Sequence, residues 1–369
     1  MTASSIDRVA RQDLSNLLKR HPLPELRGMR ILITGGTGFL GRWLLTAIAQ
    51  LNEVGNALEV VLTTRDPDRA RRTIPWLDNA TWASLVACDL SRDTLPHGRF
   101  DAVIHGAADT SASAASHPVT LLESIVEGSR KVLRRAANDQ CRHVLMISSG
   151  AVYLPQEPGR RSLCEDAPCG GNPQYGANAY GLGKCAMEAL AIAHADTFGL
   201  PVAIARCFAF VGGGLPLNAH FAIGNFIRDA LAGGPIVVAG SGTAIRSYLY
   251  AADLAVWLLS ILVRAPARAV YNVGSDQPIH IGALATSVRD LLAPEAQVVI
   301  EDRTRSEARP CYLPSIHVAR RELGLDVWTP LETAIRRTAE AAAAQRAPWA
   351  SLSQDRGTSC PGQTPSPDA

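Results

Sequence analysis

Residues 29–45 read MRILITGGTGFLGRWLL, and this stretch decides the fold. A short apolar run is followed by four glycines within seven residues, and then by apolar residues at helical spacing. A strand, a glycine-rich turn and a helix in this order are the setting of a dinucleotide fingerprint. The N–H groups and the dipole at the amino end of such a helix hold a pyrophosphate, which glycine allows to approach closely. We therefore expect a nucleotide site here.

The glycines fit two registers of this fingerprint, Gly36-x-Gly38-x-x-Gly41 and Gly35-x-x-Gly38-x-x-Gly41. The sequence does not choose between them, because both leave backbone N–H groups at the amino end of the helix. The residues predicted to contact a cofactor in this turn are Gly35, Gly38, Phe39, Leu40 and Gly41.

The strand and helix of this turn begin a repeating pattern. Further apolar runs occupy residues 58–64, 100–108, 142–149, 201–208 and 269–275. Helical spacing is found at residues 42–51, 119–137, 180–198 and near 220–232, and residues 253–265 form an apolar stretch that predicts a core helix. Strands that are apolar on both faces and alternate with helices are typical of a parallel sheet covered on each side. We predict an α/β fold with a doubly wound parallel sheet.

The pattern becomes less regular after residue 207, which predicts a second, smaller lobe. We assign residues 1–28 to an N-terminal extension and residues 29–205 to a dinucleotide-binding domain, to which residues 246–280 return. The lobe is expected at residues 206–245 and 281–344. Residues 345–369 are rich in Pro, Ser and Gly, so they are expected to form a disordered tail.

Composition excludes several classes of protein. The chain has 369 residues, 47% hydrophobic and 19% charged, with a net charge of +2, which gives no sign of a nucleic-acid partner. The longest apolar run, at residues 255–263, is half a membrane span, and the amino terminus lacks a secretory pattern. The eight cysteines show no zinc-ligand spacing, so free thiols and no metal are expected. We expect a cytoplasmic protein.

The end of the second predicted strand bears on the choice of cofactor. An acidic residue there binds the adenosine ribose in NAD-specific proteins. This chain reads VVLTTRDPDR, so Thr63 and Thr64 take the carboxylate position and Arg65 follows. A hydroxyl and a guanidinium suit a 2′-phosphate, which favours NADP(H), with NAD(H) possible; alternatively, Arg65 is a solvated loop residue. Asp89 could accept from the adenine amino group or could cap a helix.

With these residues in place, the chain resembles the extended short-chain dehydrogenases/reductases, and within them the NAD-dependent epimerase/dehydratase family that acts on nucleotide sugars. The resemblance covers roughly residues 29–340. Its motifs here are TGGTGFLG, VIHGAA, SSGAVY, Tyr180-x-x-x-Lys184, RCFAFVG, GSGTAIRSYLYAADLA and RRELGLDVWTPLETAI. It implies a Rossmann fold with a smaller C-terminal substrate-binding lobe, and a homodimer.

Three side chains carry the predicted chemistry. Tyr180 and Lys184 lie four residues apart, so on a helix they share a face. A nearby ammonium is expected to lower the phenol pKa, which would let Tyr180 exchange a proton as hydride moves, while Lys184 also binds the nicotinamide ribose. Ser149, at a predicted strand end, would bind the same substrate oxygen. His105 is expected to be structural, followed by small residues that make room for the cofactor, with Ala107 as a contact.

The two residues after Ser149 bear on the type of reaction. In the resembling 4,6-dehydratases an Asp and a Glu follow this serine or threonine, and decarboxylase relatives also keep the Glu. Here these positions are Gly150 and Ala151, which counts against both reactions. What remains is hydride transfer at a ring carbon, expected at C4. A keto-sugar reductase is the leading interpretation and a 4-epimerase with retained NAD the alternative.

Two arginines match family positions that bind the substrate diphosphate. Arg246 lies in GTAIRSYLY and Arg309 in EARPCYLP, although either could be a surface arginine. The chain departs from the family pattern where Ala209 and Ile125 replace two usual asparagines, so the sugar pocket is expected to be unusual.

Two rival classes remain open. A non-catalytic NADP-sensing regulator on the same fold would typically lose the tyrosine or the lysine, and this chain keeps both. An enzyme for a carbonyl compound without a nucleotide would not need Arg246 and Arg309.

Overall fold

The computed structural model describes residues 5–108, 116–156, 161–171, 174, 178–219, 221–302 and 310–350. Seven strands form one parallel sheet in the order β11-β6-β5-β4-β1-β2-β3. They are β1 (Arg30–Thr34), β2 (Glu59–Thr64), β3 (Ala83–Ala87), β4 (Ala102–His105), β5 (His143–Ser149), β6 (Val202–Cys207) and β11 (Val270–Val273). The predicted doubly wound Rossmann sheet is confirmed.

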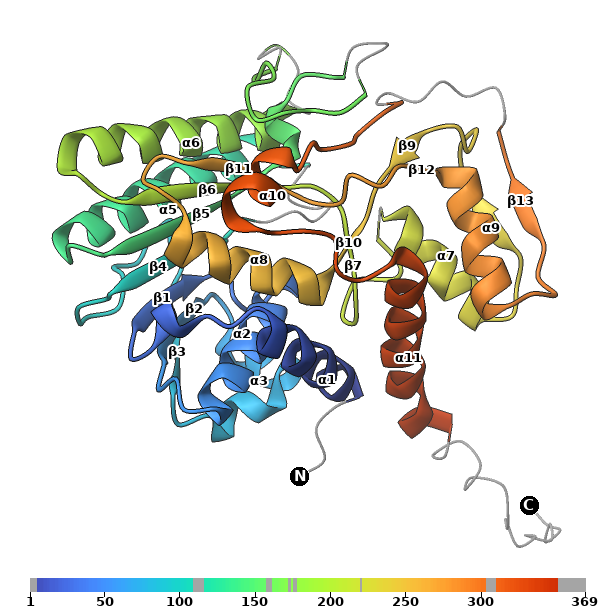
Figure 1. Cartoon of the computed structure of the whole chain (residues 1–369), viewed down its shortest axis with the longest axis horizontal. Coiled ribbons are helices and arrows are strands. Elements are labelled where there is room, and N and C mark those ends of the chain that lie inside the picture. Colours follow the sequence, from blue (N-terminus) through green and yellow to red (C-terminus); the bar gives the residue numbers. More distant parts are fainter. Residues whose placement is uncertain are drawn as a thin grey trace, which may run out of the picture.

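Helices cover both faces of this sheet (Figure 1). Alternate residues of each strand point to opposite faces, so Leu32 and Val103 pack with α5 and α6, whereas Ile33 and Ile104 pack with α2 and α8. The helices of this domain are α2 (Phe39–Glu53), α3 (Pro67–Thr73), α5 (Pro118–Asn138), α6 (Ala179–Phe198) and α8 (Ala251–Arg264).

Helix α8 confirms the core helix predicted at residues 253–265. Leu254, Trp257 and Leu258 are fully buried, because the sheet covers one side of α8 and α1 packs on another. A helix that is hydrophobic all round must be enclosed in this way. The indole of Trp257 donates to the Asp326 carbonyl at 3.0 Å.

The N-terminal helix α1 (Ser5–Arg20) is an integral part of the fold. Its apolar face, with Leu14 fully buried, packs on α2, α8 and α11 (Leu331–Ala350). The Tyr250 hydroxyl donates to Asp13 at 2.7 Å, and Arg337 of α11 lies 3.3 Å from the same carboxylate. Burial raises the pKa of Asp13, and these two partners oppose that rise. Helix α1 is therefore fixed by both apolar and polar contacts.

The remaining elements form a smaller group beside the sheet, at the right of Figure 1. They are β7 (Phe210–Val211), α7 (Ala222–Leu231), β8 (Ile236–Val238), β9 (Ile245–Arg246), β10 (Leu249–Tyr250), β12 (Ile279–His280), α9 (Ile281–Leu292) and β13 (Val298–Ile300). Helix α10 (His317–Leu323) instead packs on β11 and α8. The segment before α10 packs against the segment between β5 and α6, where the Leu163 amide donates to the Leu313 carbonyl at 2.8 Å. This contact brings residues 310–316 beside the carboxyl end of β5.

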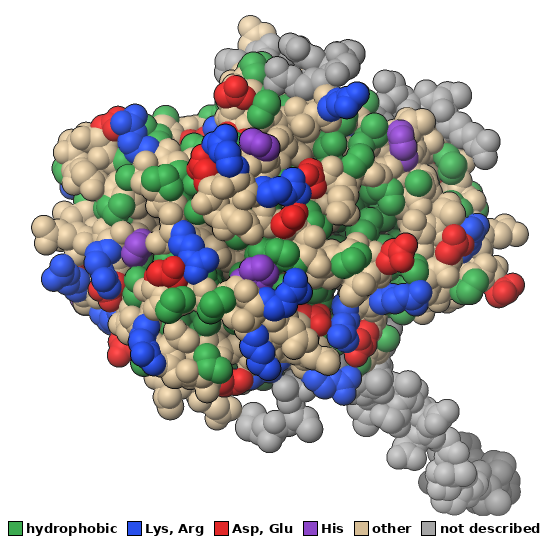
Figure 2. Space-filling model, in the orientation of Figure 1, with side chains coloured by type: hydrophobic (Ala, Val, Ile, Leu, Met, Phe, Trp, Pro, Cys, Tyr) green, Lys and Arg blue, Asp and Glu red, His purple; other side chains and the backbone are tan. Residues whose placement is uncertain are grey.

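The cysteines, helices and surface charges of the described residues bear on the expectations from composition. The seven cysteines among them are free thiols, as predicted. None of the helices in the described ranges has both the length and the apolar composition to cross a bilayer. Basic and acidic side chains are interspersed on the face drawn in Figure 2. The predicted tail boundary at residue 345 falls inside α11, which ends at Ala350, and residues 351–369 lie outside the described residues.

His105, at the end of β4, joins three elements in the core. The Ser129 hydroxyl donates to the Ile125 carbonyl at 2.6 Å, so its oxygen accepts from His105 Nε2 at 3.1 Å. His105 Nδ1 then accepts from the Thr34 hydroxyl at 2.7 Å. The neutral ring with its proton on Nε2 satisfies all these contacts. Burial, together with the charge of Lys184, lowers the pKa of His105 to about 3.

The His105 pKa predicts a pH dependence of stability. As the pH falls, His105 gains a proton near pH 6.5 in the unfolded chain but only near pH 3 in the folded protein. The contribution of neutral His105 to the free energy of unfolding is therefore complete above pH 6.5 and is lost as the pH falls toward 3. Between pH 6.5 and 4.5 the wild type should lose about 2 to 3 kcal/mol more unfolding free energy than His105→Gln, measured by chemical denaturation. His317→Gln, at an exposed histidine, is the control. Parallel pH curves for wild type and His105→Gln would contradict this account.

Candidate active site

The turn between β1 and α2 is closely packed, and this packing requires glycine. Gly35 has a φ of +73°, and a Cβ on it would lie 2.6 Å from the Ala107 amide nitrogen. A Cβ on Gly41 would lie 2.2 Å from Gly36 Cα, so the first turn of α2 rests directly on the glycine turn. Gly38 is different, since its Cβ would meet nothing nearer than 3.6 Å. Packing therefore does not require glycine at residue 38.

The amino end of α2 is open and uncapped. Gly38 is the N-cap, the helix has no side-chain cap, and its first turn contains no acidic residue. Gly38 is exposed and Phe39 and Leu40 are partly exposed, so the unpaired N–H groups of this turn can reach a ligand. An uncapped helix end with its positive dipole suits a pyrophosphate. The arrangement thus fits a dinucleotide and brings together all the turn residues predicted to contact it.

The order of the strands supports the same location. The chain proceeds from β1 outward to β2 and β3, and then returns to β4 on the other side of β1. Ligands of open α/β sheets bind beyond the carboxyl strand ends at such a switch point. Ala107 follows β4, is partly exposed and faces Gly35 across this point. The predicted contact at Ala107 therefore lies beside the glycine turn.

Arg65 and Asp89 lie at the carboxyl ends of the neighbouring strands β2 and β3. Thr63 is buried, Thr64 is partly exposed and Arg65 is exposed. Asp89 Oδ1 accepts from the Ser91 amide at 2.9 Å and the Ser91 hydroxyl at 2.6 Å. These hydrogen bonds, with a smaller contribution from Arg65, lower the pKa of Asp89. The helix-cap interpretation of Asp89 is wrong, because residues 90–101 form no helix.

Ser149 and Tyr180 meet at the carboxyl end of β5. Ser149 is the last residue of β5, and Tyr180 lies in the first turn of α6. The Ser149 hydroxyl lies close enough to the Tyr180 phenol to affect its pKa, and it accepts from the Ala151 amide at 3.1 Å. Two hydroxyl groups that face one another in this way can bind one substrate oxygen together. The structure therefore brings the predicted pair close together.

Lys184 lies one helical turn after Tyr180 and is buried. Its ammonium donates to the Ile147 carbonyl at 2.7 Å and lies 6.0 Å from the centre of the Tyr180 ring. Burial lowers the pKa of Lys184 to about 8. The amine is thus close to its titration point at neutral pH, which is unusual for lysine.

The expected lowering of the Tyr180 pKa is wrong for the protein groups alone. Burial raises the pKa of Tyr180 to about 12, and the Ser149 hydrogen bond only partly opposes this rise. The physical reason is geometric. The Lys184 ammonium points to the Ile147 carbonyl. The cost of removing the phenolate from water is therefore larger than the attraction between the phenolate and this ammonium.

Gly150 is enclosed by two aromatic rings that sequence reasoning missed. A Cβ on Gly150 would lie 2.3 Å from the Tyr312 hydroxyl oxygen and 2.9 Å from Phe208 Cζ. These rings pack on one another, with centroids 4.6 Å apart. Tyr312 belongs to the segment that returns from the smaller group of elements. The space beside Ser149 that a side chain at residue 150 would need is therefore taken by a phenol.

Ile125, where the family usually has asparagine, also has a packing role. It is buried in α5, and a Cβ on Gly183 would lie 3.0 Å from its Cδ1. The apolar side chain thus fills the contact between α5 and α6. No hydrogen bond to the Tyr180 region can come from this position.

The two predicted diphosphate arginines are not brought together by the described residues. Arg246, in β9, is partly exposed and donates to the Ile245 carbonyl at 2.8 Å. Arg309 lies outside the described residues. The described residues contain no cluster of His, Cys, Asp and Glu that could hold a metal ion.

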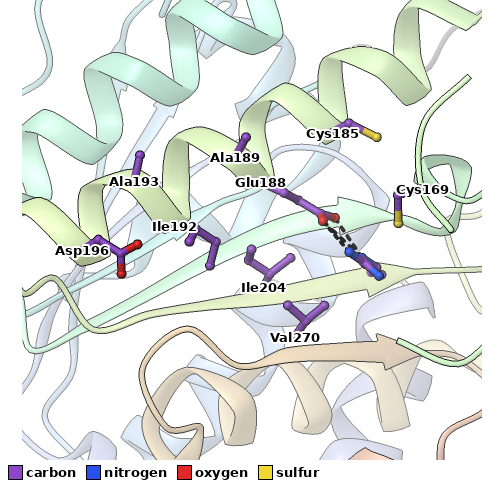
Figure 3. A pocket seen from close by; sticks show the side chains of 10 residues that line it. Cys169, Cys185, Glu188, Ala189, Ile192, Ala193, Asp196, Ile204 and Val270 are labelled. Carbon is purple, nitrogen blue, oxygen red and sulfur yellow. Dashed lines mark hydrogen bonds and ion pairs between the residues drawn. The ribbon is translucent and has the colours of Figure 1, made fainter. Parts of the chain in front are cut away.

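A hollow of about 550 Å³ lies on a different flank of α6 and is separate from this site (Figure 3). Its lining includes Cys169, Cys185, Glu188, Asp196 and Arg206. None of the residues predicted to carry chemistry or to bind the dinucleotide lines it.

A glycine turn at a strand switch point, with a Ser-Tyr-Lys group beside it, defines a Rossmann-type dinucleotide-binding protein. The model of the NAD dependent epimerase/dehydratase family matches residues 31–274. The chain therefore belongs to this family, and the resemblance seen in the sequence is confirmed.

Individual relatives agree with this assignment. UDP-glucuronic acid decarboxylase 6 of Arabidopsis thaliana is 27% identical over 307 residues, covering 82% of this chain and 84% of that protein. A UDP-glucose 4-epimerase from Thermotoga maritima shares the fold with a TM-score of 0.73 at 18% identity, covering 86% of this chain and 99% of that one. A dTDP-glucose 4,6-dehydratase from Streptomyces venezuelae, solved with NAD and TYD bound, has a TM-score of 0.72 at 24% identity, covering 88% and 100%.

Two glycine variants separate packing from ligand binding in the turn. Gly41→Ala should lower the unfolding free energy by about 1 to 3 kcal/mol, because its Cβ overlaps Gly36. Gly38→Ala should keep wild-type stability, because its Cβ has room, but weaken dinucleotide binding at least about tenfold through obstruction of the helix end. Thermal unfolding and fluorescence titration with NADH and NADPH measure these effects. Wild-type affinity in a folded Gly38→Ala protein would contradict the placement of the pyrophosphate.

Proposed function

We propose that this protein is an NAD(P)-dependent oxidoreductase that transfers hydride at a ring carbon of a nucleotide sugar, with C4 the favoured position. The observation that carries the proposal is the contact between Ser149 and Tyr180, with Lys184 below them, beside an open amino end of α2. The leading function is reduction of a nucleotide-linked 4-keto-sugar.

Each residue of the group has a distinct role in this proposal. Tyr180 protonates the oxygen of the reacting carbon in the reductive direction and removes a proton in the oxidative one. Ser149 donates to the same oxygen and orients it toward the phenol. Lys184 binds the nicotinamide ribose hydroxyls through its ammonium. A bound nicotinamide cofactor supplies or accepts the hydride. Its positive charge, when oxidised, adds to that of Lys184 and favours the phenolate, which opposes the effect of burial.

The surroundings of Gly150 favour a reaction that consists of hydride transfer only. They count against dehydration and decarboxylation. Dehydration needs a proton donor and acceptor after the serine, and residues 150 and 151 are Gly and Ala. The return segment also leaves no space for an acidic side chain at residue 150, since Tyr312 and Phe208 enclose it. The relatives named as a decarboxylase and a dehydratase therefore share the fold and family of this chain, and we propose that they differ in the reaction.

NADPH is the proposed cofactor, with NADH as the alternative. Arg65 is exposed at the carboxyl end of β2, where a 2′-phosphate of the adenosine ribose would lie. No carboxylate occupies residues 63 and 64, so a 2′-phosphate meets no repulsion at the strand end itself. However, the Asp89 carboxylate lies near Arg65, and this negative charge in part favours NADH over NADPH. The solved dehydratase relative holds NAD.

The proposed substrate is a sugar linked to a nucleoside diphosphate. Arg246 and Arg309 are proposed to bind its phosphates, since guanidinium groups bind oxyanions in pairs. The names of the relatives, which include UDP- and dTDP-sugar enzymes, agree with this class. We also propose that the enzyme acts as a homodimer.

A second candidate is a 4-epimerase with permanently bound NAD. Its support is the SSGAVY motif, which fits epimerases as well as reductases, and the 4-epimerase among the proteins of the same fold. A non-catalytic NADP-sensing regulator is a more remote alternative, because the chain keeps Ser149, Tyr180 and Lys184 in contact.

Replacement of the phenol tests the proposal directly. The wild type, supplied with NADPH and a UDP- or dTDP-linked 4-keto-sugar, should turn over, and Tyr180→Phe should reduce kcat about 10² to 10⁴-fold while cofactor affinity stays similar. Tyr271→Phe, at a buried tyrosine bonded to Glu322, is the matched control and should keep wild-type kcat.

The identity of the cofactor released by denaturation separates the alternatives. An empty protein that takes up NADPH supports the reductase, and tightly held NAD supports the epimerase. Binding of NADPH with no turnover of any nucleotide sugar would support the regulator, and full activity in Tyr180→Phe would contradict the assigned chemistry.

A further inference from the structure

A second polar cluster lies one helical turn beyond Lys184. Tyr180, Lys184 and Glu188 follow one another at intervals of four residues, so they share the face of α6 that packs on the sheet. Lys184 is 2% exposed and Glu188 8% exposed. A buried carboxylate requires partners, because its desolvation is costly.

Glu188 has partners on two strands. The Ser148 hydroxyl of β5 donates to Glu188 in a short hydrogen bond. From β6, Arg206 Nε donates to Oε1 at 3.1 Å and Nη2 donates to Oε2 at 2.7 Å, and these contacts are dashed in Figure 3. Ser148 and Arg206 are direct neighbours in the sheet. The carboxylate thus holds α6 against both strands at one level.

Arg206 is itself fixed on its far side. Its Nη1 donates to the Tyr153 hydroxyl at 2.9 Å and to the Glu165 carbonyl at 2.8 Å. The Tyr153 hydroxyl then donates to Asn272 Oδ1 at 2.7 Å. The guanidinium is therefore held in one position by hydrogen bonds to three elements of the fold, and it can act as a rigid support for Glu188.

The last three residues of β5 each engage one of the three aligned side chains of α6. The Ile147 carbonyl accepts from Lys184, the Ser148 hydroxyl donates to Glu188, and the Ser149 hydroxyl lies close to the Tyr180 phenol. A shift of α6 by one residue would break all three contacts. Of these three side chains, Glu188 is held in addition by Arg206. Its position is therefore fixed independently of Tyr180 and Lys184.

We propose that Glu188 is a positioning residue for the reacting groups: through Ser148 and Arg206 it fixes the face of α6 that carries Tyr180 and Lys184 against the end of β5. The inference rests on the proposed function, because Tyr180 and Lys184 are the groups assigned to the chemistry there. Glu188 lies beside the hollow on the flank of α6 and acts through its neighbours, without contact to the reacting atoms.

The charge of Glu188 also acts on Lys184. The ionisable groups around the ammonium are Tyr180 and Glu188 of α6, Cys207 and, beyond Glu188, Arg206 of β6, and His105 of β4. Burial lowers the pKa of Lys184, and the negative charge of Glu188 opposes this effect. Glu188→Gln removes that attraction and leaves the Arg206 charge unneutralised. Both changes favour the neutral amine, so the variant should lower the Lys184 pKa further.

The chain offers a direct measurement, because it contains only three lysines, Lys19, Lys131 and Lys184. Protein labelled with ¹³C at the lysine ε-carbons should give three NMR signals, assigned with Lys19→Arg and Lys131→Arg. The Lys184 signal of the wild type should titrate near pH 8, and in Glu188→Gln its midpoint should fall by about one pH unit or more. Asp196, also on α6, forms an exposed ion pair with Arg268, and Asp196→Asn should leave the midpoint unchanged.

Ser148→Ala separates the effect of Glu188 on the position of α6 from the effect of its charge. It also provides a test if Glu188→Gln does not fold. It removes one hydrogen bond to Glu188 and keeps every charge. In the turnover assay with NADPH and a nucleotide 4-keto-sugar, kcat should fall about tenfold while KM for NADPH stays similar. Asp196→Asn should keep wild-type kcat.

The outcomes distinguish this inference from the proposed function. A shifted Lys184 midpoint in Glu188→Gln supports the coupling even if no nucleotide sugar is turned over, in which case the proposed function alone fails. An unshifted midpoint in folded Glu188→Gln, or wild-type kcat in Ser148→Ala of an active enzyme, would overturn the role of Glu188.

Discussion

A buried ammonium between α6 and β5 determines the geometry of the whole site. Lys184 reaches the Ile147 carbonyl at 2.7 Å in an interface from which water is excluded. A buried charge must find its partner, so only one register of helix on strand is acceptable. Gly181 allows α6 to approach the segment after β5 closely, since a Cβ on it would lie 2.6 Å from the Ala151 carbonyl oxygen. The contact between Ser149 and Tyr180 follows from that register.

The glycine turn supplies the second constraint and would join this site to the proposed cofactor. Its packing on β4 and α2 places an open helix end at the point where the strand order reverses. The strand order sets the position of β5, and therefore of Ser149, relative to that point. The side chains proposed to act and the loop proposed to hold the dinucleotide thus lie at the carboxyl ends of neighbouring strands of one sheet. The return segment with Tyr312 closes the space beside residue 150, which limits the chemistry available there.

The sequence predicted those features that arise from local pattern. Strong apolar runs identified β1, β2, β4, β5, β6 and β11, and the spacing of Tyr180 and Lys184 indicated a shared helix face. Strand β3 gave a weak signal, because it lies at the sheet edge and is only partly buried. The contact of Tyr312 with Gly150 joins residues 162 positions apart, since 312 − 150 = 162, and no local pattern encodes it. The Tyr180 pKa was misjudged because the direction of the Lys184 side chain depends on tertiary packing. Glu188 could have been found from its spacing after Lys184.

The central claim is hydride transfer at a sugar ring carbon beside Tyr180. It is tested most directly by NADPH carrying deuterium at the transferable position of the nicotinamide, mixed with the enzyme and a UDP- or dTDP-linked 4-keto-sugar. Mass spectrometry and NMR of the product locate the label. The account predicts one deuterium on the ring carbon that bore the carbonyl, and labelling at least about 10²-fold slower with Tyr180→Phe. Unlabelled product from the wild type, or loss of the sugar carbonyl without transfer of deuterium, would contradict it.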